Sequence, residues 1–156
     1  MTISNGPDAI ADKPGLRLGD FLCFSIYSAG HAFNRLYKPL LDELGLTYPQ
    51  YLAMVLLWEE DDRTVGQLGD KLFLESNTLT PLLKRLEAMG YVARSRDSQD
   101  ERVVRVRLTE EGRALRQKAE TVPGCVLDAT DLDIAEASRL TQELALLRAK
   151  LLSRAR

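Results

Sequence analysis

Several kinds of site are excluded by what this 156-residue chain lacks. It has only two cysteines and one histidine, too few for a disulfide framework or a zinc site. Its longest unbroken apolar run, Tyr51 to Trp58, is far too short to span a membrane. The N-terminal residues lack the basic-then-apolar pattern of a signal peptide. We therefore expect a cytoplasmic protein with no membrane partner.

A net positive charge is also missing, because the formal net charge is -2. This excludes a uniformly basic surface for coating nucleic acid, so any contact with DNA must come from a local patch. The sequence has no glycine-rich phosphate loop, no catalytic pair of carboxylates and no Ser-His-Asp arrangement. His31, the only histidine, has no metal-ligand cluster around it, so we expect no cofactor and no enzyme.

The hydrophobic fraction of 45% is enough for a core, and the apolar residues recur at helical spacing. Residues 1–17 have no period and are expected to form a flexible tail. The first helix is expected from Leu18, with Asp20 as its N-terminal cap, and Pro39 is predicted to kink or end it. Its apolar positions are Leu22, Ile26, Ala29, Phe33, Leu36 and Leu40.

Two capping boxes predict the next helices. Thr47 with Gln50 precedes the apolar run, which indicates a buried helix, and Thr64 with Gln67 begins a short one. A third helix starts with either Ser76 or Thr80 as its cap, and the sequence leaves both possibilities open. Its apolar face consists of Leu79, Leu82, Leu83, Leu86 and Met89, and Gly90 follows as the C-terminal cap.

After Gly90 the apolar period changes to two, which is typical of strands. Residues 91–96 are predicted to pair with residues 103–108 in a hairpin. Thr109 then caps a helix that is expected to stop at Pro123-Gly124, and a last helix starts near Asp131. This last helix carries a seam suited to a partner helix, made of Leu140, Leu144, Leu147 and Leu151.

Two short capped helices followed by a basic hairpin are the elements of a winged helix-turn-helix, in which the second helix enters the DNA major groove. Residues 76–107 carry seven basic side chains against four acidic ones, so the positive charge is local. Arg102, near the hairpin tip, is suited to a minor groove, with Asp100 orienting it. The predicted DNA-binding residues are Ser76, Asn77, Thr78, Thr80, Pro81, Lys84, Arg85, Arg94, Asp100 and Arg102.

These residues resemble a known family. The stretch LGDKLFLESNTLTPLLKRLEAMGYVARSRDSQDERVVRVRLTEEG is similar to the DNA-binding core of the MarR family of bacterial repressors. The stretch FLCFSIYSAGHAFNRLYKPLLDELGLTYPQYLAMVLLWE resembles the organic-hydroperoxide-sensing, OhrR-type branch. The resemblance spans roughly residues 18–127. It implies a mainly α-helical homodimer with a winged helix-turn-helix at residues 47–109, a helical dimerisation region at residues 18–44 and 110–156, and a pseudo-palindromic DNA operator.

Cys23 is the candidate sensor of the chain. It lies in the first helical turn, where free amides and the helix dipole favour a thiolate, although Asp20 would oppose this by repulsion. Tyr27 follows four residues later, near enough to donate to the sulfur. Tyr37 lies about 21 Å along the axis at about 1.5 Å per residue, so it can reach the sulfur only from a second, antiparallel chain.

In the family, the matching cysteine reacts with organic hydroperoxide, and partner-subunit tyrosines bond to it. The resemblance therefore implies Cys23 as the sensor and Tyr37 and Tyr48 as partner-chain donors, with Tyr27 as a further candidate. Some members carry a second cysteine that traps the oxidised thiol, which implies an intersubunit disulfide between Cys23 and Cys125. Two other functions remain possible: a MarR-type repressor released by a small aromatic ligand, and a thiol peroxidase.

Overall fold

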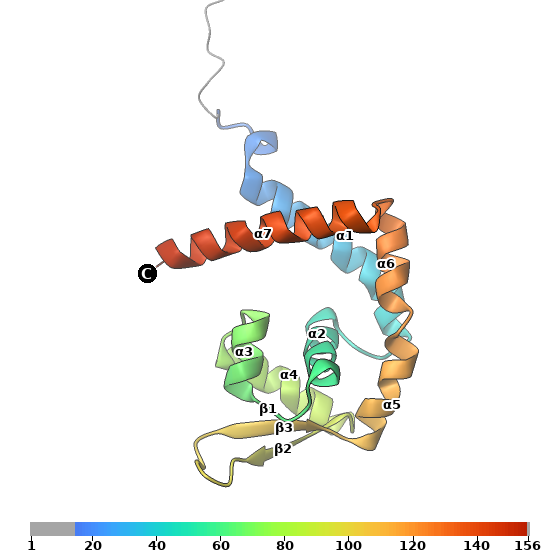
Figure 1. Ribbon diagram of the computed structural model, residues 1–156, viewed down its shortest axis with the longest axis vertical. Helices are drawn as coiled ribbons and strands as arrows, with labels where there is room; N and C mark the ends of the chain where they lie inside the picture. Colours follow the sequence, from blue (N-terminus) through green and yellow to red (C-terminus); the bar gives the residue numbers. More distant parts are fainter. Residues whose placement is uncertain (1–14, 156) are drawn as a thin grey trace, which may run out of the picture. The chain divides into compact units, whose positions relative to one another are not determined.

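The computed structural model describes residues 15–155, so all but three residues of the expected N-terminal tail lie outside the described part. The chain divides into two compact units, residues 1–35 and residues 36–156. The first unit contains a short 3₁₀ turn, η1 (Leu18–Asp20), and most of helix α1 (Leu22–Asp42). The second contains the end of α1 and all the remaining elements (Figure 1).

Helix α1 differs from expectation at its start, and one of the two alternatives predicted for Pro39 is excluded. It begins at Leu22, and Asp20 belongs to the preceding 3₁₀ turn, so Asp20 is not the cap of this helix. Pro39 does not end the helix, which continues to Asp42. A proline removes one backbone hydrogen bond. Beyond it, Leu41 is buried in the core and Leu40 packs against it, and this packing holds the last turn in place.

Helix α2 (Tyr48–Glu59) lies at the centre of the second unit, as the apolar run predicts. The predicted capping box is confirmed: the Gln50 N–H donates to the Thr47 hydroxyl, and the Gln50 side chain accepts from the Thr47 N–H. At its other end, the Trp58 indole N–H donates to the Gly112 carbonyl at 2.8 Å. Gly112 must be glycine, because a Cβ there would collide with the Tyr91 carbonyl.

Helices α3 (Val65–Leu72) and α4 (Ser76–Ala88) form the helix-turn-helix. The Thr64 and Gln67 capping box of α3 is confirmed. Neither proposed cap of α4 is correct, since Glu75 is the capping residue and Pro81 lies inside the helix. The Glu75 carbonyl starts the helix by accepting the N–H of Leu79 at 3.0 Å.

Helix α4 ends at Ala88 with Met89 as its C-cap, and the predicted Gly90 follows directly as the residue that terminates it. The Gly90 N–H bonds to the Glu87 carbonyl at 2.9 Å, and the Tyr91 N–H bonds to the Leu86 carbonyl at 3.0 Å. This pair of bonds is a Schellman motif, which needs a left-handed residue. Gly90 supplies it with φ of 85°.

The predicted hairpin is present as β2 (Val92–Arg96) and β3 (Val104–Leu108). A third strand, β1 (Arg63–Thr64), was not predicted, because two residues carry no alternating pattern. It pairs antiparallel with β3, so the strand order is β1-β3-β2. In Figure 1 the β2–β3 loop lies at one end of the sheet and α5 begins near the other.

Three helices complete the second unit: α5 (Glu110–Ala119), α6 (Val122–Thr130) and α7 (Ile134–Arg154). The Thr109 hydroxyl caps α5 as predicted, but α5 ends at Ala119 rather than at Pro123-Gly124. Pro123 instead stands in the first turn of α6, where a missing N–H costs nothing. Helix α7 starts after a capping box of Asp133 with Glu136, slightly later than expected.

The buried core runs from Leu41 to Val126 and is made mainly by α2, α4 and the sheet, with smaller contributions from α3, α5 and α6. Helix α7 has no buried residue, and Leu41 is the only buried residue of α1. Within residues 15–155, every helix is too short or too polar to cross a membrane.

Candidate nucleic-acid interface and thiol site

Helix α4 separates its two faces cleanly. Leu79, Leu83 and Leu86 are fully buried and fix the helix on the core. The other face carries the side chains that the sequence predicts for DNA binding. Of these, Thr80 is half-buried and the rest are exposed: Ser76, Asn77, Thr78, Pro81, Lys84 and Arg85.

A groove of about 420 Å³ lies between the helix-turn-helix and the hairpin. Its walls come from the start of α3, from α4 and from both strands of the hairpin. It brings predicted residues of the helix and of the hairpin together: Ser76, Thr80, Arg94 and Arg102. Thr64, at the cap of α3, also lines it.

The hairpin tip holds Arg102 in the open. Its side chain is 91% exposed. Asp100 Oδ1 accepts two bonds from Arg102, from the backbone N–H at 3.1 Å and from Nε at 3.2 Å. This is the orienting contact that the sequence predicts.

Arg94 is held less freely, because it pairs with Glu87 of α4. Its Nη2 lies 3.1 Å from Glu87 Oε1, and its backbone N–H donates to Oε2 at 2.8 Å. That backbone bond, together with the Arg94 guanidinium, lowers the pKa of Glu87. Arg94 thus ties the hairpin to the helix beside the groove.

Sequence reasoning missed an acidic turn at the base of the sheet. Asp61 accepts the Leu108 N–H at 2.8 Å and a bond from Arg113 at 3.0 Å. Asp62 accepts bonds from Arg105 at 2.8 Å and from Arg107 at 3.2 Å. The pKa of Asp62 is lowered by these hydrogen bonds, with that from Arg107 the larger cause. A run of acids after an apolar helix gives no signal that β3 lies beside it.

Ion pairs, two of them with Asp62 of this turn, change the electrostatic picture drawn from the sequence. Four of the seven basic residues between positions 76 and 107 are ion-paired: Arg94, Arg102, Arg105 and Arg107. Within residues 15–155, the remaining three form no ion pair: Lys84, Arg85 and Arg96. The free positive charge therefore lies on α4 and near the hairpin tip.

Cys23 is exposed and is the second residue of α1, so it lies in the first turn as expected. Tyr27 is exposed and stacks edge-on against His31, with ring centroids 4.4 Å apart. In the first unit, residues 15–35, no hydrogen bond joins Tyr27 to Cys23. The predicted donation from Tyr27 is therefore not formed within one chain.

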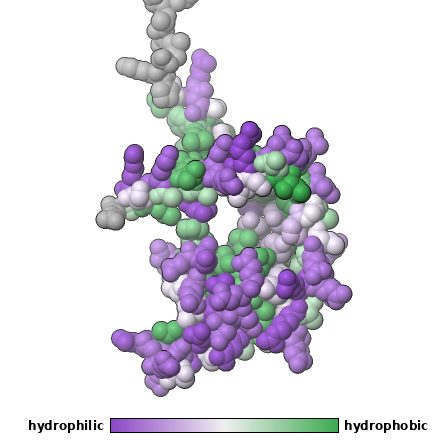
Figure 2. Space-filling model, viewed as in Figure 1, coloured by the Kyte–Doolittle hydropathy of each residue, from purple (hydrophilic) through white to green (hydrophobic). Residues whose placement is uncertain are grey.

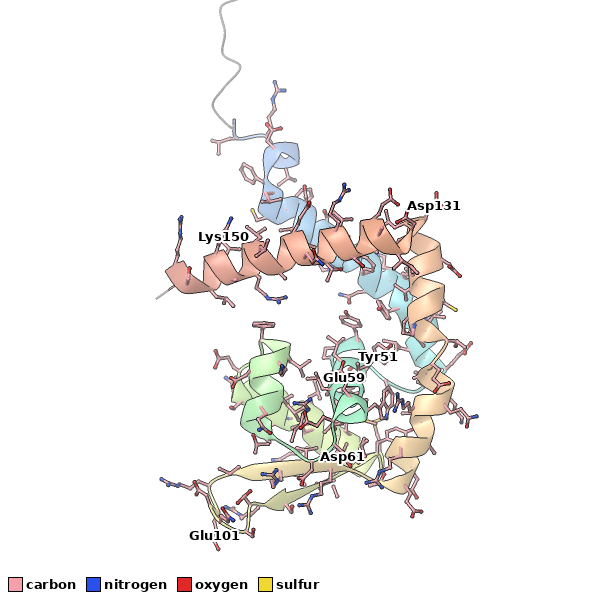
Figure 3. All side chains as sticks on the ribbon, in the orientation of Figure 1. Tyr51, Glu59, Asp61, Glu101, Asp131 and Lys150 are labelled. Carbon is pink, nitrogen blue, oxygen red and sulfur yellow. The ribbon has the colours of Figure 1, made fainter. Side chains whose placement is uncertain are left out.

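Tyr37 and Tyr48 are brought together in the second unit, with ring centroids 4.8 Å apart. Tyr51, which sequence reasoning did not select, joins them at 6.0 Å from Tyr37 (labelled in Figure 3). Burial, together with the neighbouring Tyr48 and Tyr51, raises the pKa of Tyr37 to about 12. Burial also raises the pKa of Tyr48. These phenols stay protonated at neutral pH and keep their O–H donors.

Cys125 is a free, exposed cysteine, but its setting differs from expectation. It lies in the first turn of α6 rather than after a helix end, and its N–H donates to the Thr121 carbonyl at 3.1 Å. In residues 15–155, no three His, Cys, Asp or Glu side chains gather as metal ligands.

Comparison with known families finds a match over residues 35–119 to the family described as "Transcriptional regulator SarA/Rot". The chain is 49% identical over 134 residues to the HTH-type transcriptional regulator TtmR of Methylorubrum extorquens, covering 86% of this chain and 69% of that protein. It is 48% identical over 112 residues to the organic hydroperoxide resistance transcriptional regulator of Bacillus subtilis, covering 72% of this chain and 76% of that protein.

Among solved structures, the chain resembles AbfR of Staphylococcus epidermidis. Reduced AbfR bound to DNA matches with a TM-score of 0.71 and 38% identity, covering 87% of this chain and 95% of that one. Disulfide-formed AbfR matches with a TM-score of 0.59 at the same identity, covering 84% of this chain and 92% of that one. Overoxidised AbfR bound to DNA matches with a TM-score of 0.70, covering 86% of this chain and 95% of that one.

Proposed function

Because this chain belongs to the SarA/Rot and MarR type of winged-helix transcriptional regulators, we propose that it is a homodimeric, peroxide-responsive repressor. The reduced dimer binds a pseudo-palindromic double-stranded operator. Organic hydroperoxide oxidises Cys23 and releases the DNA.

The observation that carries DNA binding is the groove between α4 and the hairpin. It aligns the exposed face of α4 with Arg102, so the helix can enter a major groove while the hairpin reaches the adjacent minor groove. In this proposal Asn77, Thr78 and Arg85 approach base edges. The other residues of the face contact phosphates or thymine methyl groups: Ser76, Thr80, Pro81 and Lys84. Arg94 of β2 contacts a phosphate beside them.

Exposed apolar side chains support dimerisation through residues 18–44 and 110–156. Leu22, Ile26 and Phe33 of α1 are 61%, 40% and 43% exposed. Leu144 and Leu151 of α7 are 48% and 58% exposed, and Figure 2 shows hydrophobic side chains at the surface along α7. Surfaces of this kind mark interaction sites. A two-fold dimer then presents two copies of α4 to successive major grooves.

In the redox step the peroxide is the oxidant, and the two thiols, Cys23 and Cys125, are oxidised. The Cys23 thiolate attacks the outer oxygen of ROOH, the O–O bond breaks, and the alkoxide takes up a proton and leaves as ROH. The sulfenic acid on Cys23 then condenses with the Cys125 thiol of the partner subunit, forming a disulfide and water. Tyr37 and Tyr48 of the partner donate hydrogen bonds from their hydroxyl groups to the sulfur. Their raised pKa values keep these hydroxyl groups protonated.

The AbfR structures support a disulfide as the releasing step. AbfR is bound to DNA both in its reduced and in its overoxidised form. Disulfide-formed AbfR resembles this chain less than DNA-bound AbfR does, at equal identity. The two forms of that relative therefore differ in conformation. A change of this kind would alter the spacing of the two α4 helices.

The test is a binding assay with the duplex that the reduced protein selects from a random-sequence pool. Cumene hydroperoxide should release wild-type protein, and dithiothreitol should restore binding. Cys23→Ser should bind the duplex normally and stay bound under peroxide. Cys125→Ser should also stay bound, because its Cys23 is oxidised without forming a disulfide. An oxidised wild type that shows no dimer band on a non-reducing gel would contradict the disulfide.

The same assay separates the other functions. A regulator controlled by an aromatic ligand would respond to its effector equally well as Cys23→Ser. A thiol peroxidase would consume many equivalents of peroxide per thiol when supplied with a reductant. The proposed sensor consumes about one equivalent for each reactive cysteine.

A further inference from the structure

A relay of charged side chains runs from the base of the hairpin to its tip. Arg105 Nε donates to Asp62 Oδ1 at 2.8 Å, and Arg105 Nη1 donates to Asp97 Oδ2 at 3.0 Å. The other oxygen of Asp97 accepts the Asp100 N–H at 3.3 Å, and Asp100 in turn holds Arg102. We propose that Asp62 and Arg105 are positioning residues that orient Arg102 for DNA without touching DNA themselves. This inference rests on the proposed role of Arg102 at the minor groove.

Strand register explains why Asp62 stands between two arginines. Strand β1 pairs with β3 so that Arg63 lies opposite Val106. Continuing the register by one residue sets Asp62 opposite Arg107 and on the same face as Arg105. Arg107 Nε also lies 3.0 Å from Asp62 Oδ1, which makes an ion pair. The turn into β1 thus delivers a carboxylate to the face of the sheet where the hairpin arginines lie.

The geometry of Arg105 argues against a direct role in binding phosphate. Nε and Nη1 donate to Asp62 and Asp97, and Nη2 donates to the Asp62 backbone carbonyl at 3.1 Å. All three guanidinium nitrogens are therefore engaged within the protein. A planar guanidinium that donates from three nitrogens within the protein is fixed in place and has little capacity left to bind a phosphate.

Exposure changes along the relay in the direction that positioning requires. The side chains of Asp97 and Arg105 are 18% and 29% exposed, whereas that of Arg102 is 91% exposed. Ion pairs shielded from water are less weakened by salt than open ones. The middle of the relay is therefore shielded from water, and its last member is the most exposed.

Asp97 connects the relay to the loop. Its Oδ1 accepts the N–H of Gln99 at 2.8 Å as well as that of Asp100. Its own N–H donates to the Val103 carbonyl at 2.8 Å, which closes the loop. Because Arg105 grips the second oxygen of Asp97, a shift of Arg105 moves the backbone that carries Asp100 and Arg102.

The first experiment compares Asp62→Gly with Asp131→Gly. Asp62 has φ of 59° and Asp131 has φ of 57°, so glycine fits both positions without strain. Both substitutions remove one negative charge. Figure 3 places Asp131 at the junction of α6 and α7, away from the Glu101 label that marks the hairpin tip. The two variants therefore differ in the loss of the relay and not in net charge.

The readout is the affinity of the reduced protein for the duplex selected by the wild type, measured by fluorescence anisotropy. Asp62→Gly should weaken binding about fivefold or more, a sizeable part of the roughly tenfold loss expected for Arg102→Ala. Asp131→Gly should stay within about twofold of the wild type. If Asp62 merely reduced the positive potential near DNA, Asp62→Gly would bind more tightly, and the proposal would be overturned.

A double-mutant cycle tests whether Asp62 acts through Arg102. In an Arg102→Ala background, Asp62→Gly should weaken binding by less than about twofold further. Independent, additive losses would overturn the proposal, since they would mean that Asp62 supports the fold and not the arginine. Thermal unfolding checks that each variant folds, and Asp62→Asn, which keeps the side-chain shape, replaces Asp62→Gly if that variant does not.

The assay also separates this inference from the proposed function. A wild type that selects no duplex would overturn both. A wild type that binds its duplex, beside an Asp62→Gly variant that binds equally well, would overturn only the positioning role.

Discussion

Two regions of the molecule differ in how far they bury their apolar side chains. One region runs from α2 to α6, and the other consists of the two long helices α1 and α7. The first region encloses them: Met54, Leu68 and Val106 are 0% exposed. The long helices leave them open, with Leu140, Leu144, Leu151 and Leu152 of α7 all at least 40% exposed. Both are helices of 21 residues, so a long helix forms here although most of its apolar side chains are not buried.

The difference teaches where this protein needs a second copy. Removing apolar area from water contributes roughly 25 cal/mol for each Å². A core buried within one chain gains this energy at any protein concentration, because no second chain is needed. Helices whose apolar faces remain exposed gain that energy only on association. The stability of the two regions should therefore depend differently on concentration.

The largest effect on DNA affinity should come from introducing charge among the exposed leucines of α7. Leu144→Asp combined with Leu151→Asp should convert the dimer to a monomer. Operator binding should weaken about 100-fold or more, because the two α4 helices are no longer linked and cannot bind the two half-sites of one operator as a unit. Sedimentation velocity and anisotropy measure this. Ser138→Asp with Gln142→Asp adds the same charge on the other side of α7. A double leucine variant that remains dimeric would remove α7 from the interface.

Truncating a side chain in the buried core should reduce DNA affinity less but should lower the free energy of unfolding of the single chain more. Leu83→Ala should lower the free energy of unfolding by about 2–5 kcal/mol, because Leu83 is 0% exposed and its loss leaves a cavity. Urea unfolding at two protein concentrations should give the same loss. Leu144→Ala should instead show a loss that depends on concentration, and equal behaviour of the two variants would break the comparison.

Local signals within the core region should contribute about 1 kcal/mol each. Thr64→Ala removes the hydroxyl that accepts the Gln67 N–H at 3.0 Å and should lower the stability by about that amount. Thr121 is the matched control, since it caps α6 without a side-chain bond. A loss in Thr121→Ala equal to that in Thr64→Ala would show that the capping bond is not the cause.

The smallest effect at neutral pH belongs to the tyrosine cluster. The folded pKa of Tyr37 is about 12, above its ordinary value, so its contribution is fully present below about pH 10. Above that pH the unfolded chain loses the phenol proton first, and stability falls between about pH 10 and 12. Tyr37→Phe should make this fall shallower while changing little at pH 7. Urea unfolding across this pH range measures it, and an unchanged slope would contradict the assignment.

Much of the fold was predictable because its signals are local. Both predicted capping boxes, the Gly90 termination and the β2–β3 hairpin are confirmed. The errors fall where a residue type has two meanings. Pro123 reads as a stop but opens α6, Ser76 reads as a cap but is already helical, and Asp20 lies in a 3₁₀ turn.

The candidate site shows the same division. The sequence supplied the exposed face of α4, the bond between Asp100 and Arg102, and the two thiols. It did not supply Asp61 or Asp62, whose partners are more than forty residues away, nor Tyr51. It also placed Arg105 and Arg107 in the local positive patch without showing that both form ion pairs with Asp62.

By itself, the sequence determined which segments are helices, which face of each is apolar and where the hairpin turns, because these depend on side chains within a few residues of one another. The tertiary structure decided which charges remain free, since β1 sets Asp62 beside two arginines more than forty residues away. It also decided which apolar faces stay uncovered, because burial depends on what packs across from a helix and not on its own pattern.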